Sequence, residues 1–444
     1  MTMAPELPSD PPLSEALLSR LWAGQRFPES ALVTTDGVRL RVLHPGIAGR
    51  GAGPDFRDAI VAASGRLMRG DVELHQRSSD FRAHGHHGDP RYGRLVLHVV
   101  FADDATESTR VRSGTKPVPV VALSSWLERR TGELSAWLAS PSLWREPCHD
   151  ALARLGGERV GEALAALGDR RFAEREASLG ATLDADGPGP ALYGALLTGL
   201  GYGGDRAYLE ELAAILPWRA LAATLGAAPD AERAMTAEAL LLGAAGLLEA
   251  PRGRYEEDLA AAWRRLGVRA PVSRALPPVT LRPANHPARR LAGLAALLDR
   301  HEPLFAGQPP PRELLDGPAA QLIASWCVPA EGYWREHIAP GSPARRPAGA
   351  LIGRGRASEL LINAVLPWTV ALAERRGASA HAAAARAAFA RLPSPARYGR
   401  LAFLEANLGV RSGAWRPDAR AQQGLLALYK TECTQGGCGR CALS

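Results

Sequence analysis

The chain has 444 residues, more than a single typical domain, which predicts two or three domains with enough apolar content for hydrophobic cores. The formal net charge is +7 and almost all positive charge is arginine, because Lys116 and Lys430 are the only lysines. Arginine suits contact with phosphate, although a GC-rich genome produces the same bias. There is no run of about 18 apolar residues and no signal-like start, which predicts a cytoplasmic protein without a membrane span.

Residues 1–126 predict a small α+β domain. A helix is expected within residues 13–27, because apolar side chains recur there at the spacing of one helix face. These side chains are Leu17, Leu18, Leu21 and Trp22. Five apolar runs bounded by turn residues predict the strands of one sheet, at residues 38–43, 55–62, 71–76, 95–101 and 118–123. The fourth run is apolar on both faces, which is typical of a central strand.

Residues 127–428 predict a larger all-helical domain. Strand signals fade there, and segments rich in alanine and leucine dominate, at residues 153–167, 207–215, 231–248 and 288–298. Repeated prolines end these helices. Residues 429–444 form a tail that carries cysteines. The predicted fold class is an α+β domain followed by an all-α domain and a cysteine-bearing C-terminal tail.

Three ionisable side chains share one face of the predicted strand at 71–76. Side chains alternate along a strand, so Asp71, Glu73 and His75 line one face. Val72 and Leu74 line the other. Buried charges need a partner of opposite charge or a metal ion. The pattern predicts a metal site, and a salt-bridged strand edge without a metal is the alternative.

Asp55 opens the preceding predicted strand and brings a second acid to this site. Asp55 and Glu73 supply the oxygen ligands that Mg²⁺ and Mn²⁺ prefer, with open positions for water and phosphate. Such an ion polarises phosphate and activates water. His75 is expected to orient or deprotonate that water, or to bind the ion. Glu15 or Asp71 is expected to complete the set of metal ligands.

The segments GPDF and GDVELH resemble the signature of the PD-(D/E)xK, restriction-endonuclease-like nucleases. In these nucleases Pro-Asp opens one strand and acid-x-Lys lies on the next. The resemblance implies a small mixed sheet, metal ligation by Asp55 and Glu73, and His75 at the position of the lysine. An upstream helix adds another acid in many of these nucleases, and Glu15 is the candidate here.

A second resemblance extends over nearly the whole chain, to an uncharacterised bacterial family labelled only as a domain of unknown function. It rests on GPDFRDAIV, GDVELHQRSSDF, LVLHVVFADD, AEALLLGAAGLL, RPANHPARRLAGLA, LLINAVLPW and the terminal cysteines. The resemblance implies no activity. It implies that the α+β part, the helical part and the cysteine tail belong together.

Six of the 11 histidines fall in or near the predicted site: His44, His75, His84, His86, His87 and His98. Imidazoles suit zinc, manganese or iron. A zinc-dependent hydrolase is therefore an alternative, with a histidine of residues 84–87 within ligand distance of Glu73. The glycines and proline around HGHH favour a polar loop instead, and the apolar strand around His98 favours a hydrogen-bonded core histidine.

The C-terminal cysteines Cys433, Cys438 and Cys441 predict a metal site. The glycines between them allow the tight turns that close thiolates around an ion, and Cys148, Cys327 or a histidine is expected as the fourth ligand. The expected metal is a structural zinc ion, with an iron–sulfur cluster as the second choice. A flexible tail with incidental thiols is the alternative.

The combined pattern predicts a nuclease that hydrolyses DNA or RNA with Mg²⁺ or Mn²⁺. The helical domain is expected to bind the nucleic acid or a protein partner. Arginines at 289–290 and 345–346 are candidate nucleic-acid contacts, whereas most tryptophans lie in apolar segments typical of a core. The alternatives are a non-catalytic nucleic-acid-binding or scaffold protein with a degenerate nuclease-like domain, and the zinc-dependent hydrolase.

Overall fold

A computed structural model describes most of the chain: residues 14–25, 31–49, 53–112, 114, 116–127, 148–201, 206–265, 285–344, 349–395, 398, 401–410, 415–433 and 441–444. Contacts group the chain into two compact units. The first comprises Met1–Ala163, Tyr398–Arg416 and Leu425–Ser444, and the second comprises Leu164–Arg397 and Pro417–Gly424. The domain boundaries predicted at residues 126 and 428 stay predictions.

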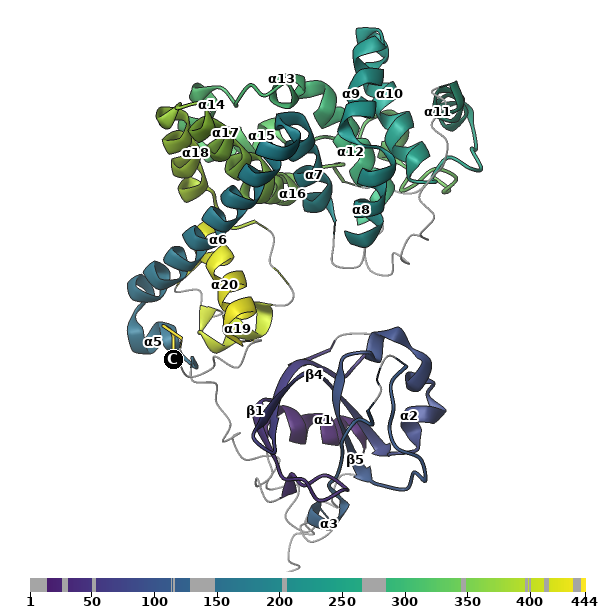
Figure 1. Ribbon diagram of the computed structural model, residues 1–444, viewed down its shortest axis with the longest axis vertical. Helices are drawn as coiled ribbons and strands as arrows, with labels where there is room; N and C mark the ends of the chain where they lie inside the picture. The colour runs from purple at the N-terminus through teal and green to yellow at the C-terminus, as the bar shows by residue number, and fades with distance from the viewer. Residues whose placement is uncertain are drawn as a thin grey trace, which may run out of the picture. The chain divides into compact units, whose positions relative to one another are not determined.

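The first unit is built on a six-stranded mixed sheet (Figure 1). Its strands are β1 (Leu40–His44), β2 (Ile47–Ala48), β3 (Phe56–Ala63), β4 (Arg66–Arg77), β5 (Leu95–Ala102) and β6 (Val120–Ala122). The hydrogen-bonded order is β1-β3-β4-β5-β6, with β2 pairing to β3. The pairs from β1 to β4 are antiparallel, and the pairs β4-β5 and β5-β6 are parallel. The predicted α+β fold with a small mixed sheet is confirmed.

The strand β4 begins five residues earlier than the predicted 71–76, because a tight hairpin joins it to β3. Ala63 pairs with Arg66, which leaves Ser64 and Gly65 as a two-residue turn. Both turn residues have positive φ, 46° and 73°. A type I′ hairpin turn requires this backbone, and its twist matches that of the strands it joins. The hairpin sets β3 and β4 in register over most of their length.

The helix α1 (Glu15–Ala23) packs against one face of the sheet, which curls around it in Figure 1. The four apolar residues predicted for one helix face are all buried. They share a hydrophobic core with Val72 and Leu74 of β4 and with Leu97 and Val99 of β5. Alternate residues of β4 and β5 therefore face α1, and the residues between them face the opposite side of the sheet.

The opposite side is covered by the segment that joins β4 to β5. It contains α2 (Asp80–Ala83) and two short 3₁₀ turns, η2 (His86–Gly88) and η3 (Pro90–Tyr92). Phe81 and Tyr92 are buried with Leu95, Val111 and Val118 in a second, smaller core. These two aromatic side chains anchor the segment at both ends. The histidines between them are thereby held over the sheet.

Beyond this sheet, helices dominate the secondary structure of the described residues, which confirms the predicted helical region. After α3 (Ser124–Leu127) they are α5 (Ala151–Leu155), α6 (Gly157–Asp186), α7 (Pro188–Leu200), α8 (Arg206–Ile215), α9 (Trp218–Ala227), α10 (Asp230–Ala244), α11 (Arg254–Arg265), α12 (Pro287–Arg300), α13 (Glu302–Phe305), α14 (Arg312–Asp316), α15 (Ala319–Ser325), η6 (Gly332–Arg335), α16 (Arg354–Leu360), η7 (Leu361–Val365), α17 (Leu366–Arg375), α18 (Ser379–Arg391), α19 (Ala402–Asn407) and α20 (Ala419–Thr431). No helix among the described residues has the length and apolar character to cross a membrane.

Arg289, a candidate nucleic-acid contact in the sequence, is fully buried in the helical region. Its guanidinium donates hydrogen bonds to the carbonyl oxygens of Trp334 at 2.6 Å, His337 at 2.7 Å and Gly349 at 2.6 Å. Arg290 is also buried and donates to the carbonyl of Asn285 at 3.1 Å. Both arginines therefore organise loops of the protein, and the prediction that they contact nucleic acid was wrong. The candidates at 345–346 lie outside the described residues.

The sheet offers a matched pair of leucines that tests its core. Leu97 in β5 is fully buried, whereas the side chain of Leu67 in β4 is 47% exposed. We expect Leu97→Ala to lower the free energy required to open the sheet by about 2–5 kcal/mol. Leu67→Ala should change it by less than about 0.5 kcal/mol. Hydrogen exchange of β3, β4 and β5 peptides measures this energy apart from the helical region, and equal effects would contradict the assigned core.

Candidate metal centre

Two acidic side chains meet where β3 begins beside β4. Asp55 directly precedes β3, and Glu73 lies in β4 opposite it, since Phe56 pairs with Val72. The backbone N–H of Asp55 donates to Oε2 of Glu73 at 3.0 Å, and the N–H of Leu74 donates to Oδ2 of Asp55 at 2.9 Å. These reciprocal hydrogen bonds hold both carboxylates at one edge of the strand pair. The two predicted acids are therefore brought together.

The electrostatics of this acidic pair are unfavourable without a cation. Burial raises the pKa of Glu73 to about 8, and repulsion by Asp55 adds to the effect. Burial also raises the pKa of Asp55, against the opposing hydrogen bond from Leu74. Glu15, in the first turn of α1, has a pKa raised by partial burial and by Asp55. The acids of α1 and β4 and the one before β3 thus influence one another, and like charges close together away from water favour protonation or metal binding.

His75 lies two residues beyond Glu73 on the same face of β4, as predicted. Its Nε2 is 3.8 Å from Oε1 of Glu73, and its Nδ1 is 2.9 Å from Nε2 of His98 in β5. His98 in turn contacts Oγ1 of Thr109 through its Nδ1 at 3.0 Å. Burial lowers the pKa of His75 to about 4 and that of His98 to about 3. Both imidazoles are therefore neutral near pH 7, which is the form that binds metals.

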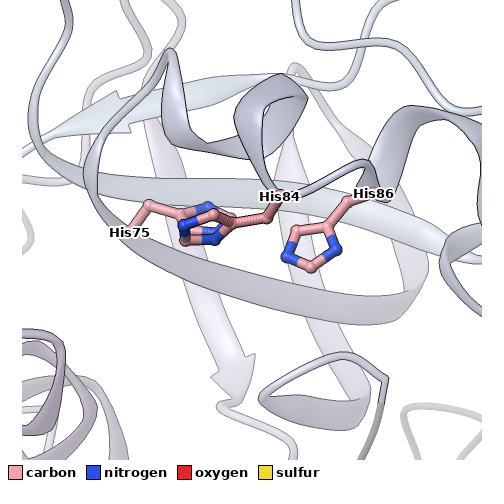
Figure 2. Close-up of side chains that lie close together, drawn as sticks. All are labelled: His75, His84 and His86. Carbon is pink, nitrogen blue, oxygen red and sulfur yellow. The ribbon is translucent and has the colours of Figure 1, made fainter.

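Two further histidines complete a cluster, which Figure 2 shows as three neighbouring rings. One candidate ligand atom from each of His75, His84 and His86 lies within 4.8 Å of the others. We call these three residues the histidine cluster. Nε2 of His86 is 3.3 Å from Oε1 of Glu73, so the cluster adjoins the acidic pair. The glycine between His84 and His86 has a φ of 77°, a backbone that favours glycine and turns both rings toward β4.

Asp71, the third charged residue of the predicted strand face, lies apart from this group. Its carboxylate accepts a hydrogen bond from the N–H of Asp58 at 3.1 Å. Burial raises its pKa, and the guanidinium groups of Arg94 and Arg57 lower it. Asp71 therefore has cationic neighbours of its own, whereas the acidic pair has none among the residues that shift the pKa of Glu73.

The cysteines stay a prediction. Cys148 is buried, Cys433 and Cys441 are half-buried, and Cys438 lies outside the described residues. Within the described ranges, the histidine cluster is the only group of three or more histidine, cysteine or acidic residues that could hold an ion.

For the segment of the histidine cluster, the sequence favoured a polar loop over a metal site. The spacing His-x-His in HGHH is the signal that could have pointed to it, but the surrounding glycines favoured a polar loop. In the structure this segment folds back over β4, because Phe81 and Tyr92 are buried on either side of it. The ring of His86 stacks on Tyr92 with centroids 4.1 Å apart, which fixes its place beside Glu73.

The fold and the site define a protein with a mixed-sheet unit that carries a buried carboxylate–imidazole cluster, together with a large helical region. The chain belongs to the family described as a protein of unknown function (DUF2851), whose model matches residues 15–395. The match includes Glu15, the acidic pair and the histidine cluster, and it ends before the three C-terminal cysteines. No curated protein and no solved structure matches the chain.

The pKa shift of Glu73 predicts a pH dependence of stability for the metal-free protein. The folded pKa of about 8 exceeds the ordinary value of 4.5, so stability from the protonated form is lost as pH rises through about 8. His75, His86 and His98 have lowered pKa values, so their contribution is complete about one pH unit above 6.5 and varies little from about pH 7.5 upward. Between about pH 7.5 and about pH 9 the wild type should lose on the order of 1 kcal/mol.

Glu73→Gln removes this titration and should flatten the loss between the two pH values. The measurement is urea-induced unfolding of chelator-treated wild type and variant at both pH values. An equal loss of stability in both proteins would mean that Glu73 is not the group responsible.

Proposed function

We propose that this protein is a divalent-metal-dependent hydrolase that cleaves phosphodiester bonds in nucleic acid. The observation that carries the proposal is the pairing of half-buried Asp55 with buried Glu73 through reciprocal backbone hydrogen bonds, near enough to Glu15 for Asp55 to raise its pKa. The carboxylates of Asp55 and Glu73 supply the oxygen ligands that Mg²⁺ or Mn²⁺ prefers, and one or two carboxylates with water in the other positions suffice for Mg²⁺. A bound ion would relieve the repulsion between the acids, polarise a phosphate oxygen and activate a water molecule.

The order of elements agrees with what the resemblance to PD-(D/E)xK nucleases implies. An acid lies on the helix α1, an aspartate opens β3, and an acid-x-His pair lies on the antiparallel neighbour β4. His75 takes the place of the lysine, and its neutral imidazole faces Glu73. The chain departs from these nucleases in the connection after β4, where they usually carry a longer helix and α2 has only four residues.

Exposed arginines support a polyanionic substrate. Arg77, Arg82 and Arg91 come from β4, α2 and η3, the elements that frame the site, and all three are exposed. Each forms an ion pair at the surface, with Asp104, Glu107 and Asp89 respectively. Exposed ion pairs contribute little free energy, so a phosphate backbone can compete for these guanidinium groups.

A zinc-dependent hydrolase is the second candidate. It requires a histidine of residues 84–87 within ligand distance of Glu73, and the 3.3 Å contact of His86 meets that requirement. Both candidates use Glu73 and differ in the metal that supports turnover. A scaffold that binds nucleic acid without cleaving it is the remaining outcome of the test.

The test is cleavage of labelled DNA and RNA by purified protein with Mg²⁺, Mn²⁺ or Zn²⁺. Asp55→Asn and Glu73→Gln keep the shape of each side chain and remove its charge, so each should lower the cleavage rate at least about 100-fold. Asp36→Asn is the matched control, because Asp36 is an exposed turn aspartate. Its rate should equal that of the wild type.

Cleavage that survives in both site variants would remove the assignment. Turnover with Zn²⁺ alone would favour the second candidate, and salt-sensitive binding without cleavage under any metal would leave the scaffold.

A further inference from the structure

We propose that the histidine cluster and Glu73 form a binding site for a divalent transition-metal ion of the zinc, manganese or iron class. The use of this ion in hydrolysis rests on the proposed function, whereas the binding itself does not. Asp55 lies beside Glu73 at the start of β3. The carboxylate of Glu73 presents Oε2 to the N–H of Asp55 and Oε1 to the imidazoles of His75 and His86.

The three histidines lie close enough to share one ion, and Glu73 lies beside two of them. With metal–ligand bonds of about 2.0–2.1 Å, tetrahedral ligands lie about 3.3–3.5 Å from one another. Oε1 of Glu73 is 3.3 Å from Nε2 of His86 and 3.8 Å from Nε2 of His75. One ligand atom from each of His75, His84 and His86 lies within 4.8 Å of the others, and this group does not include Glu73. Side-chain rotations would bring Glu73 into the set, since His84 is exposed and His86 is half-buried.

The ring of His75 is held in the orientation of a metal ligand. Metal-binding histidines donate their second ring N–H to a hydrogen-bond acceptor, which fixes the tautomer. Nδ1 of His75 contacts Nε2 of His98, and Nδ1 of His98 contacts the hydroxyl of Thr109. If each Nδ1 carries the proton and donates it along this chain, Nε2 of His75 keeps its lone pair toward Glu73. All three residues are buried, so water does not compete for these contacts.

The ligand types select the metal. Imidazole suits zinc, iron and manganese, whereas Mg²⁺ takes oxygen ligands and keeps most of its water. The ion would also place positive charge beside Glu73, where Asp55 and Glu15 already contribute negative charge.

The experiment measures metal binding without nucleic acid. Chelator-treated full-length wild type, His84→Ala, His86→Ala and His87→Ala are titrated with Zn²⁺, Mn²⁺ and Mg²⁺ by calorimetry, and bound zinc is counted by elemental analysis. His87 is the matched control, because it is an exposed histidine of the same segment outside the cluster. Any ion held by the C-terminal cysteines is common to all four proteins, so the differences report the histidine cluster.

We expect wild type and His87→Ala to bind one more zinc ion per chain than His84→Ala and His86→Ala. The affinity lost in those two variants should exceed the roughly 10- to 100-fold cost of removing an outer-shell partner. Mn²⁺ should bind more weakly than Zn²⁺ at the same site, and Mg²⁺ should not compete. If an alanine variant fails to fold, His84→Asn and His86→Gln replace it, since both keep a polar side chain in the segment.

Equal zinc content and affinity in all four proteins would overturn the site, and so would a loss of zinc in His87→Ala as large as in the other variants. Neither result depends on cleavage. A protein that binds zinc through the cluster but cleaves nothing would refute the proposed function alone, and a protein that cleaves with Mg²⁺ while the cluster binds no ion would refute this inference alone.

Discussion

The burial of Glu73 beside Asp55 is the constraint on which the site depends. The pairing of β3 with β4 places both acids at the start of β3, and each backbone hydrogen bond fixes one carboxylate against the other strand. Burial and mutual repulsion then make two ionised carboxylates costly, so the pair must hold a proton or a cation. The proposed chemistry of the region depends on that choice, because only the ionised pair offers ligands to a metal ion.

The positions of the histidines depend on a second, smaller core. Phe81 and Tyr92 are buried at the two ends of the segment between β4 and β5, and the loop between them has little regular structure to hold its shape. Their burial lets exposed, glycine-flanked histidines approach a buried strand. The edge-on contact of His75 with Phe81, at a centroid distance of 6.2 Å, links this small core to the site. Packing of two aromatic rings therefore decides whether imidazoles reach Glu73.

The helical region buries charge in a different way. Glu238 accepts hydrogen bonds from Tyr255 at 2.7 Å and from Nε1 of Trp334 at 2.8 Å, and Arg289 donates to three carbonyl oxygens. Half-buried Glu238 and buried Arg289 thus have neutral hydrogen-bonding partners, which lowers the cost of removing their charges from water. The acidic pair of the sheet has a like charge as its neighbour. The polar groups of the helical region are therefore suited to stabilise loops, whereas the acidic pair is suited to bind an ion.

Local patterns in the sequence were enough to predict α1, most strands and the strand face of the site, but not β2 or the start of β4. Alternation along 71–76 placed Glu73 and His75 on one face and Val72 and Leu74 on the core side, and helical periodicity found α1, because both patterns depend only on local geometry. The other contacts of the site depend on how separate segments pack together. The contacts of His84 and His86 with β4, the pairing of His75 with His98, and the burial of Arg289 join residues distant in sequence. Such contacts arise from packing. A short motif such as HGHH, or a pair of arginines, does not show by itself which part of the protein will pack against it.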